Sequence, residues 1–337
     1  MASAPLAQPP EAFRRLSARL GADPLQIQGP GGNTSFKSGG AMWIKASGTR
    51  LADAGHEEVF VAVDLERARA EIDGRAGDGT CRAARLDPDS PVRPSIETTF
   101  HALLDWPVVL HTHSVATLAH VVGGEGTRAA LARLEGLGAV AVPYRKPGLP
   151  LTHAIREAAA GDPPVLLLRN HGLIVCGRTV EEADGLIREV EARLALTPSD
   201  VPGHEAGASR RAAPLGWREV PWATALAAEP MRARATAGTL YPDHAVFLGP
   251  GVGTDPDEAG GRRVVVTDRT LLREDAPPVA EAMLRCLLDV LSRVPPDWTV
   301  EPIGTEAEAA LLDWDAETYR QKLAQPGEAR PAAPEKG

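Results

Sequence analysis

Apolar and polar positions alternate along the chain in stretches that predict both helices and strands. Apolar side chains recur at helical spacing in residues 11–20, which end at a glycine, and a period of two around a Ser-Gly-Gly turn in residues 35–45 predicts a β-hairpin. The same patterns predict strands at residues 58–64, 108–110, 165–168 and 173–176, and helices at residues 96–104 and 278–291 and after residues 114 and 179. Residues 24–28 are expected to be extended and residues 73–90 to form an exposed loop.

Because strands and helices alternate, the pattern up to about residue 200 favours a layered α/β domain. Ser95, Ser114 and Thr179 precede three of the expected helices, where their hydroxyl groups can cap the first turn. A segment with Pro and Gly at residues 198–204 predicts a boundary between a catalytic domain, residues 1–200, and a C-terminal α/β extension, residues 203–325. The Pro- and Ala-rich residues 326–337 are expected to be a disordered tail.

Composition narrows the classes of partner and the compartment. The 337 residues carry 36 Lys and Arg against 45 Asp and Glu, and the Arg residues are interleaved with acidic ones, so nucleic acid is not an expected partner. Three widely separated cysteines fit a reducing compartment. The first residues lack a charged lead into an apolar segment, and no run of 18 apolar residues occurs. We therefore expect a cytoplasmic protein with no membrane partner.

The stretch GPGGNTS at residues 29–35 is rich in glycine and in small polar side chains. Glycine reaches positive φ without strain and lets backbone N–H groups turn into a concavity that binds anions. An ordinary turn is the alternative interpretation. The stretch matches neither the dinucleotide fingerprint nor a P-loop.

Three histidines are placed to meet at strand ends. His111 and His113 stand two apart at the end of an expected strand, so both side chains point to one face, and His171 lies in a tight turn between two strands. Three neutral imidazoles at one point make a site for a divalent metal, usually zinc, with an open position for substrate. Surface or hydrogen-bonded core histidines are the alternative.

A carboxylate is expected near these histidines. Glu97 lies in the first turn of an expected helix, where it either stabilises the helix dipole or acts as a base beside a metal-bound hydroxyketone. His101 follows on the same face, and either supports Glu97 or is a hydrogen-bonded structural residue, the interpretation we favour. His120 is interpreted as structural.

The ordered set of motifs resembles the class II aldolase/adducin family. The set comprises GGNTS, Ala46-Ser47-Gly48, Pro94-Ser95-Ile96-Glu97 with His101, His111-Thr-His113, Pro143-Tyr144 and Asn170-His171-Gly172-Leu173. The chain is most similar to L-fuculose-phosphate and L-rhamnulose-phosphate aldolases, and to the aldolase part of bifunctional rhamnulose-phosphate aldolase/dehydrogenase proteins. The resemblance is specific over residues 20–195 and looser over residues 241–248 and 314–320. It implies a three-layer α/β/α fold around a central mixed, largely antiparallel sheet.

The resemblance also implies a role for individual residues. His111, His113 and His171 would bind Zn²⁺, with Mn²⁺ or Co²⁺ as alternatives, and Glu97 would occupy a fourth position and then act as the acid/base. Tyr144 would protonate the aldehyde oxygen in a neighbouring subunit of a homo-oligomer, a tetramer in related aldolases; a buried structural tyrosine is the alternative. The substrate's phosphate would be held by Gly32, Asn33, Ser47, Gly48 and Ser95.

Two departures bear on the substrate. Ile96 replaces the second Ser of the family's Ser-Ser-Glu, and Lys45-Ala46 stands where many aldolases have Thr-Pro, so Lys45 either adds a charge at the anion or points outward. The expected activity is retro-aldol cleavage of a phosphorylated ketose through a zinc-stabilised enediolate. The alternatives are a 3-oxo sugar-acid phosphate decarboxylase, a pentulose-phosphate epimerase or a dehydratase on the same scaffold, and an adducin-like interaction protein, which the presence of all three histidines disfavours.

Overall fold

The computed structural model describes residues 8–90, 92–199, 212–315 and 317–319. Its strands are β1 (Asn33–Ser38), β2 (Ala41–Lys45), β3 (Phe60–Asp64), β4 (Val108–Thr112), β5 (Ala139–Val142), β6 (Val165–Leu168), β7 (Gly172–Gly177), β8 (Trp217–Glu219), β9 (Val264–Val266) and β10 (Thr270–Arg273). Its α-helices are α1 (Glu11–Ala22), α2 (Leu65–Ile72), α3 (Thr98–Leu103), α4 (Val115–Val121), α5 (Gly124–Arg133), α6 (Leu149–Ala158), α7 (Val180–Leu194), α8 (Met231–Ala235), α9 (Pro242–Leu248), α10 (Val279–Arg293) and α11 (Thr305–Leu312). Two 3₁₀ helices are η1 (Leu51–Gly55) and η2 (Pro221–Ala227).

The larger sheet has the strand order β3-β2-β1-β4-β7-β6-β5. Its neighbouring strands are antiparallel except for β5 and β6, which are parallel. The register places Asn33 opposite His111 on β4, and His111 opposite Ile174 on β7. The central strands thus bring the glycine-rich stretch and two of the histidine-bearing segments to one end of the sheet.

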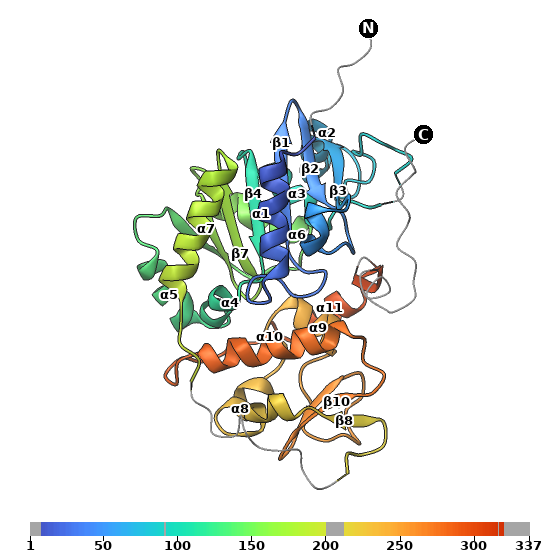
Figure 1. The fold of residues 1–337 in the computed structure, drawn as a ribbon, viewed down its shortest axis with the longest axis vertical. Helices are drawn as coiled ribbons and strands as arrows, with labels where there is room; N and C mark the ends of the chain where they lie inside the picture. The colour runs from blue at the N-terminus through green and yellow to red at the C-terminus, as the bar shows by residue number, and fades with distance from the viewer. Residues whose placement is uncertain (1–7, 91, 200–211, 316, 320–337) are drawn as a thin grey trace.

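Helices cover both faces of this sheet (Figure 1). Along β4, Val108 and Leu110 pack in the apolar cluster formed with α1, α4 and α7, whereas Val109 packs with α3 and α6 on the other face. This alternation is the period of two that a strand buried on both faces requires. The expected three-layer α/β/α arrangement around a mixed, largely antiparallel sheet is therefore confirmed.

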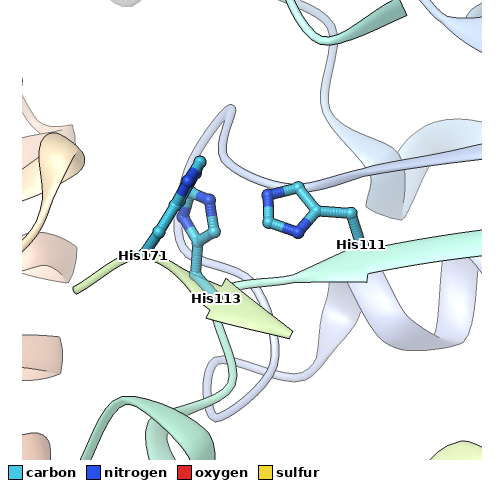
Figure 2. A group of neighbouring side chains, drawn as sticks. All are labelled: His111, His113 and His171. Carbon is cyan, nitrogen blue, oxygen red and sulfur yellow. The ribbon is translucent and has the colours of Figure 1, made fainter. Parts of the chain in front are cut away.

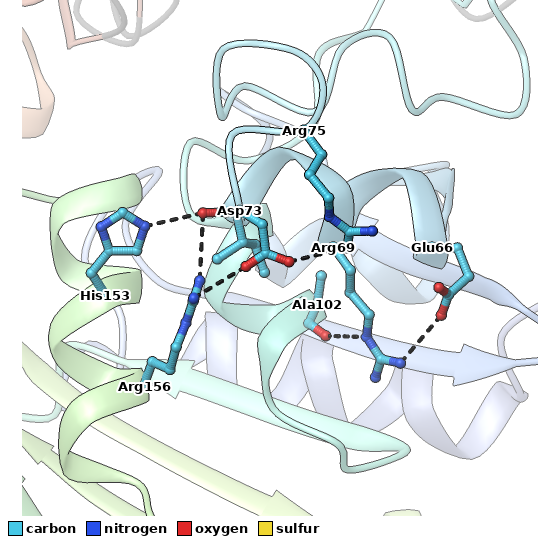
Figure 3. Close-up of polar contacts among 8 residues, drawn as sticks. Glu66, Arg69, Asp73, Arg75, Ala102, His153 and Arg156 are labelled. Carbon is cyan, nitrogen blue, oxygen red and sulfur yellow. Dashed lines mark hydrogen bonds and ion pairs between the residues drawn. The ribbon is translucent and has the colours of Figure 1, made fainter.

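Polar contacts join α2 to α3 and α6 on the second face (Figure 3). The Arg69 guanidinium donates to the backbone carbonyl of Ala102 in α3 at 3.0 Å, and His153 of α6 donates to the carbonyl of Ile72 at 3.1 Å. Asp73 accepts from both Arg75 and Arg156 at 3.0 and 3.1 Å. Because exposed ion pairs contribute little stability, these contacts serve chiefly to fix how α3 sits on the sheet.

The residues after the first domain form a small sheet, ordered β8-β10-β9, and helices α8 to α11. The expected long amphipathic helix is confirmed as α10, which packs on α4 and α9. One apolar cluster runs from Phe13 and Leu118 to Leu287, so the two parts share a core. As a result, the start of α9 lies beside the end of β4. No helix of the described segments is long and apolar enough to cross a membrane.

Several local expectations are confirmed. The hairpin forms as β1 and β2, and the Ser114 and Thr179 side chains accept hydrogen bonds from Thr117 N and Glu182 N. The expected tail at residues 326–337 and residues 200–204 of the expected boundary lie outside the described residues.

Other local expectations were wrong. Residues 24–26 form a turn in place of extended chain, and α1 continues through Gly21. In the expected exposed loop, Cys81 and Ala84 are buried, because the buried Glu71 carboxylate accepts hydrogen bonds from Gly79 N and Cys81 N at 2.9 Å. Helices α2, α5 and α6 and strand β5 were not predicted.

Candidate metal centre

The antiparallel pairing of β4 and β7 brings the three histidines together, as predicted. His111 is on β4, His113 directly follows it, and His171 ends the turn before β7, a turn made possible by Asn170 at φ 53°. One ligand nitrogen from each of the three rings lies within 4.8 Å of the others, and all three side chains are buried. Figure 2 shows the rings converging from the two chain segments.

Glu97 joins this cluster from the other side. Its Oε2 lies 3.5 Å from His111 Nε2, its Oε1 lies 3.3 Å from His171 Nε2, and the side chain is buried. The expected helix start was wrong by two residues: α3 begins at Thr98, so Glu97 is the N-cap residue and Ser95 is not. The Ser95 hydroxyl instead accepts from Glu97 N at 3.2 Å in a turn that precedes the helix.

A chain of hydrogen bonds orients the Glu97 carboxylate. The Asn33 amide donates to Glu97 Oε2 at 2.7 Å and to Ser95 Oγ at 3.1 Å, while its carbonyl oxygen accepts from His101 Nε2. His101 Nδ1 in turn pairs with Ser35 Oγ at 2.8 Å. Burial holds the pKa of His101 well below its usual value, so this ring is neutral. His101 is therefore a hydrogen-bonded structural residue, and it also supports Glu97 through Asn33.

The hydrogen bonding of His111 tests whether a cation fits this cluster. His111 Nδ1 donates to the carbonyl of Leu173 at 2.9 Å, which leaves Nε2 with a lone pair facing the Glu97 carboxylate. Among the described residues, His111 Nε2, Glu97 Oε1 and His171 Nδ1 are buried without a hydrogen-bond partner. Opposed acceptors in a dry site are costly unless a cation lies between them. The donor set thus fits a divalent metal.

Electrostatics also favour metal ligation. Burial lowers the pKa of His171 to about 3 and lowers that of His111, although Glu97 acts in the opposite direction on both. Burial acts to raise the pKa of Glu97, but the two histidines and the Asn33 hydrogen bond outweigh it and hold the pKa below its usual value. Neutral imidazoles beside an ionised carboxylate are the protonation states that bind a divalent cation.

Sequence reasoning missed Asp243, which the C-terminal part contributes. Its Oδ2 lies 2.9 Å from His113 Nδ1, and the side chain is buried at the start of α9. Gly31 makes room for this pair, since a Cβ there would lie 2.7 Å from Asp243 Oδ2 and 2.9 Å from His113 Nδ1. The looser resemblance over residues 241–248 was the only sequence signal, and it indicated no role.

All five residues predicted to bind phosphate line one cavity with Glu97, His113 and His171; they are Gly32, Asn33, Ser47, Gly48 and Ser95. Gly32 and Gly48 adopt φ of 58° and 79°, which only glycine adopts without strain. Lys45 points inward, with Nζ donating to the Pro30 carbonyl at 2.9 Å, so it adds a charge at this cavity. The cavity volume is about 20 Å³, roughly the space of one water molecule.

Tyr144 does not join the cavity within one chain. It follows β5, its hydroxyl is buried without a hydrogen-bond partner among the described residues, and it is not among the residues that line the cavity. Burial and the nearby Glu317 raise the pKa of Tyr144, so the phenol stays protonated. His120 is structural as expected, since its Nδ1 pairs with the Ala116 carbonyl at 2.8 Å.

Among curated proteins, the chain is similar to the uncharacterized oxidoreductase YuxG of Bacillus subtilis (strain 168), with 30% identity over 231 residues, 62% of this chain and 33% of that protein. The matched part thus spans a third of the length of that relative. Among solved structures, it is similar to the N-terminal class II aldolase domain of a conserved Thermoplasma acidophilum protein, with 24% identity, 58% and 95% of the two chains covered and a TM-score of 0.48. For the L-fuculose-1-phosphate aldolase of Thermus thermophilus these values are 20%, 54%, 89% and 0.38.

The family comparison covers more than half of the chain. The sequence model of the class II aldolase and adducin N-terminal domain matches residues 14–197, which contain the three histidines and Glu97. The chain belongs to the class II aldolase and adducin N-terminal domain family.

Proposed function

We propose that the protein is a divalent-metal-dependent lyase that cleaves a phosphorylated ketose by a retro-aldol reaction. Zn²⁺ is the proposed cation, and a ketose phosphate of the L-rhamnulose or L-fuculose type is the proposed substrate, as in similar family members. The observation that supports it most is the lone pair of His111 Nε2, fixed by the bond to Leu173, facing the Glu97 carboxylate. The active site is proposed to be completed by the C-terminal extension, residues 203–325, through Asp243.

The metal would be held by His111, His113 and His171, with Glu97 at a fourth position that substrate displaces. Asp243 accepts a hydrogen from His113 Nδ1, which leaves His113 Nε2 as the ligand nitrogen and fixes the ring. When bound, the cation supplies polarisation of the substrate carbonyl and stabilisation of the negative charge left by C–C cleavage.

Glu97 moves the proton at carbon. Cleavage of a ketose 1-phosphate breaks the C3–C4 bond, removes the proton of the C4 hydroxyl and adds a proton to C3. The Oε1 atom of Glu97 is the carboxylate oxygen without a hydrogen-bond partner among the described residues, so it is the atom that carries this proton, while Asn33 holds Oε2. Tyr144 of a neighbouring subunit would exchange the hydroxyl proton, and would protonate the aldehyde oxygen in the reverse direction.

The substrate's phosphate is proposed to bind at the Ser47 and Gly48 end of the cavity wall. Gly32, Asn33 and Ser95 complete that wall, although the Asn33 amide and Ser95 hydroxyl are already engaged with Glu97 and with each other. Their contribution is therefore to shape the cavity and to orient the carboxylate. A homotetramer and a cytoplasmic location stay predictions.

Glu97→Gln tests the proposal. The variant keeps the shape and the Asn33 contact but cannot carry the proton, so we expect a metal content close to that of the parent and a loss of about 10²–10⁴ in kcat on ketose phosphates. A coupled assay for the aldehyde product, run with a parallel assay for carbon dioxide release from oxo-acid phosphates, distinguishes the lyase from a decarboxylase. Cleavage by Glu97→Gln at the parent's rate would refute the role of Glu97.

A further inference from the structure

A second cavity adjoins the metal cavity and is far larger. Its volume is about 290 Å³, and Ser47, Ile96 and Pro147 line both. The metal cavity, at about 20 Å³, cannot enclose a phosphate group together with the reacting carbons. Part of the substrate must therefore extend past Ser47 into the second cavity.

Three cationic side chains, Arg82, Arg93 and Lys146, line this second cavity. Within the described part of the chain, none of them makes an ion pair with a carboxylate. Asp78 is the one carboxylate among the residues that line the cavity, and its Oδ1 already accepts from Thr80 N at 3.0 Å and Thr80 Oγ1 at 2.5 Å. Clustered cations without counter-charges repel each other and focus a positive potential in the cavity, which attracts an anion.

Backbone pairing and aromatic rings hold two of these cations in place. Ser47 N donates to the carbonyl of Arg93 at 2.8 Å, so Arg93 lies beside the proposed phosphate-binding end of the metal cavity. The Arg93 guanidinium lies over the Tyr319 ring at 4.1 Å, and Lys146 Nζ lies over the Trp314 ring at 4.4 Å. Cation–π contacts fix the side chains while leaving N–H groups free to donate to an anion.

The start of α6 lies at the same cavity. Gly148, the N-cap residue, makes no side-chain cap, and Gly148, Leu149 and Pro150 all line the cavity. The helix dipole therefore adds to the positive potential that the three cations create.

We propose that Arg82, Arg93 and Lys146 form the charged half of the substrate's anion site and bind the outer oxygens of a phosphate monoester whose inner side rests on Ser47 and Gly48. The glycine-rich wall supplies neutral donors, and the cations of the second cavity neutralise the dianion. This inference rests on the proposed function only for the identity of the anion. It also explains how the site tolerates Ile96 in place of a serine, since Ile96 lines the wall between the two cavities.

Calorimetric titration of the metal-loaded protein with inorganic phosphate tests the inference. We expect Arg93→Gln and Lys146→Gln each to weaken binding by at least about tenfold, since a hydrogen bond to a charged group contributes about 1.5–3 kcal/mol. Arg145→Gln is the matched control: Arg145 carries the same charge, is exposed and does not line the cavity, so binding should stay within about twofold of the parent.

The outcomes separate the anion site from the lyase reaction. Unchanged phosphate affinity in Arg93→Gln and Lys146→Gln, or an equal loss in Arg145→Gln, would overturn the inference. A changed oligomeric state with unchanged phosphate affinity would also overturn it, because the cations would then bind a neighbouring subunit. Phosphate binding needs no turnover, so a protein that shows the expected losses but cleaves no ketose phosphate keeps the anion site and refutes the lyase proposal.

Discussion

Replacing Gly31 by Ala tests how closely the C-terminal extension is fitted to the metal centre. The φ of Gly31 lies outside the left-handed region, so alanine is not excluded by the backbone. A Cβ would lie 2.7 Å from Asp243 Oδ2, 2.9 Å from His113 Nδ1 and 3.0 Å from the Gln28 carbonyl. Ordinary contacts begin near 3.4 Å, so the carboxylate and the imidazole must each move by about 0.5–0.7 Å.

The magnitude follows from the contact that this movement breaks. Overpacking of a filled site costs about 1–3 kcal/mol of folding stability. Loss of the hydrogen-bond partner of a ligating histidine costs about 10–100-fold in metal affinity. We therefore expect Gly31→Ala to bind Zn²⁺ about 10–100-fold more weakly than the parent, as measured by competition with a chromophoric chelator, with a modest loss in urea unfolding.

Gly185→Ala is the control for the alanine substitution itself. Gly185 lies in α7, and a Cβ there would meet no atom within 4 Å. Alanine in a helix interior is favoured over glycine by about 1 kcal/mol, so this variant should be at least as stable as the parent and bind the metal equally well. Parent-like metal affinity in Gly31→Ala would refute the reasoning that Asp243 and His113 act as a pair.

Three further predictions follow from buried polar groups. His101→Ala removes the partners of Asn33 Oδ1 and Ser35 Oγ, so urea unfolding should show a loss of about 1–3 kcal/mol or more, and a change within about 0.5 kcal/mol would contradict the network. Burial lowers the pKa of Lys37 from 10.5 to about 7, so the unfolded chain binds more protons between these values; the stability of the parent relative to Lys37→Met should rise with pH from about 7 to about 10.5, and a pH-independent difference would argue against a neutral lysine there. Tyr144→Phe should slow cleavage while the metal content is retained, and a strictly monomeric parent in light scattering would exclude the proposed action of Tyr144 on a neighbour.

The metal ligands could be predicted from sequence because the signal is local. The strand period places His111 and His113 on one face, and a tight turn brings His171 to the adjacent strand, so short-range rules suffice. Glu97 was found for the same reason, although its helix begins later than expected because Ser95 forms a turn ahead of Thr98.

The rest of the site depends on contacts between distant segments. Asp243 reaches His113 only because α10 packs on α4 and carries α9 to the end of the sheet. The inward direction of Lys45 is set by its contact with the Pro30 carbonyl, which strand alternation alone could not decide. Strand β5 has four residues, three of them only partly buried, so its hydrophobic pattern was too weak to predict.

The central claim is that three imidazoles and Glu97 hold one divalent cation. X-ray absorption at the zinc edge of the zinc-loaded protein tests it most directly, because it reports the ligands themselves. We expect three imidazole nitrogens at about 2.0–2.1 Å with oxygen completing the shell, and the loss of one imidazole in His171→Ala. A shell with fewer than three imidazoles in the parent, or one unchanged in His171→Ala, would contradict the account.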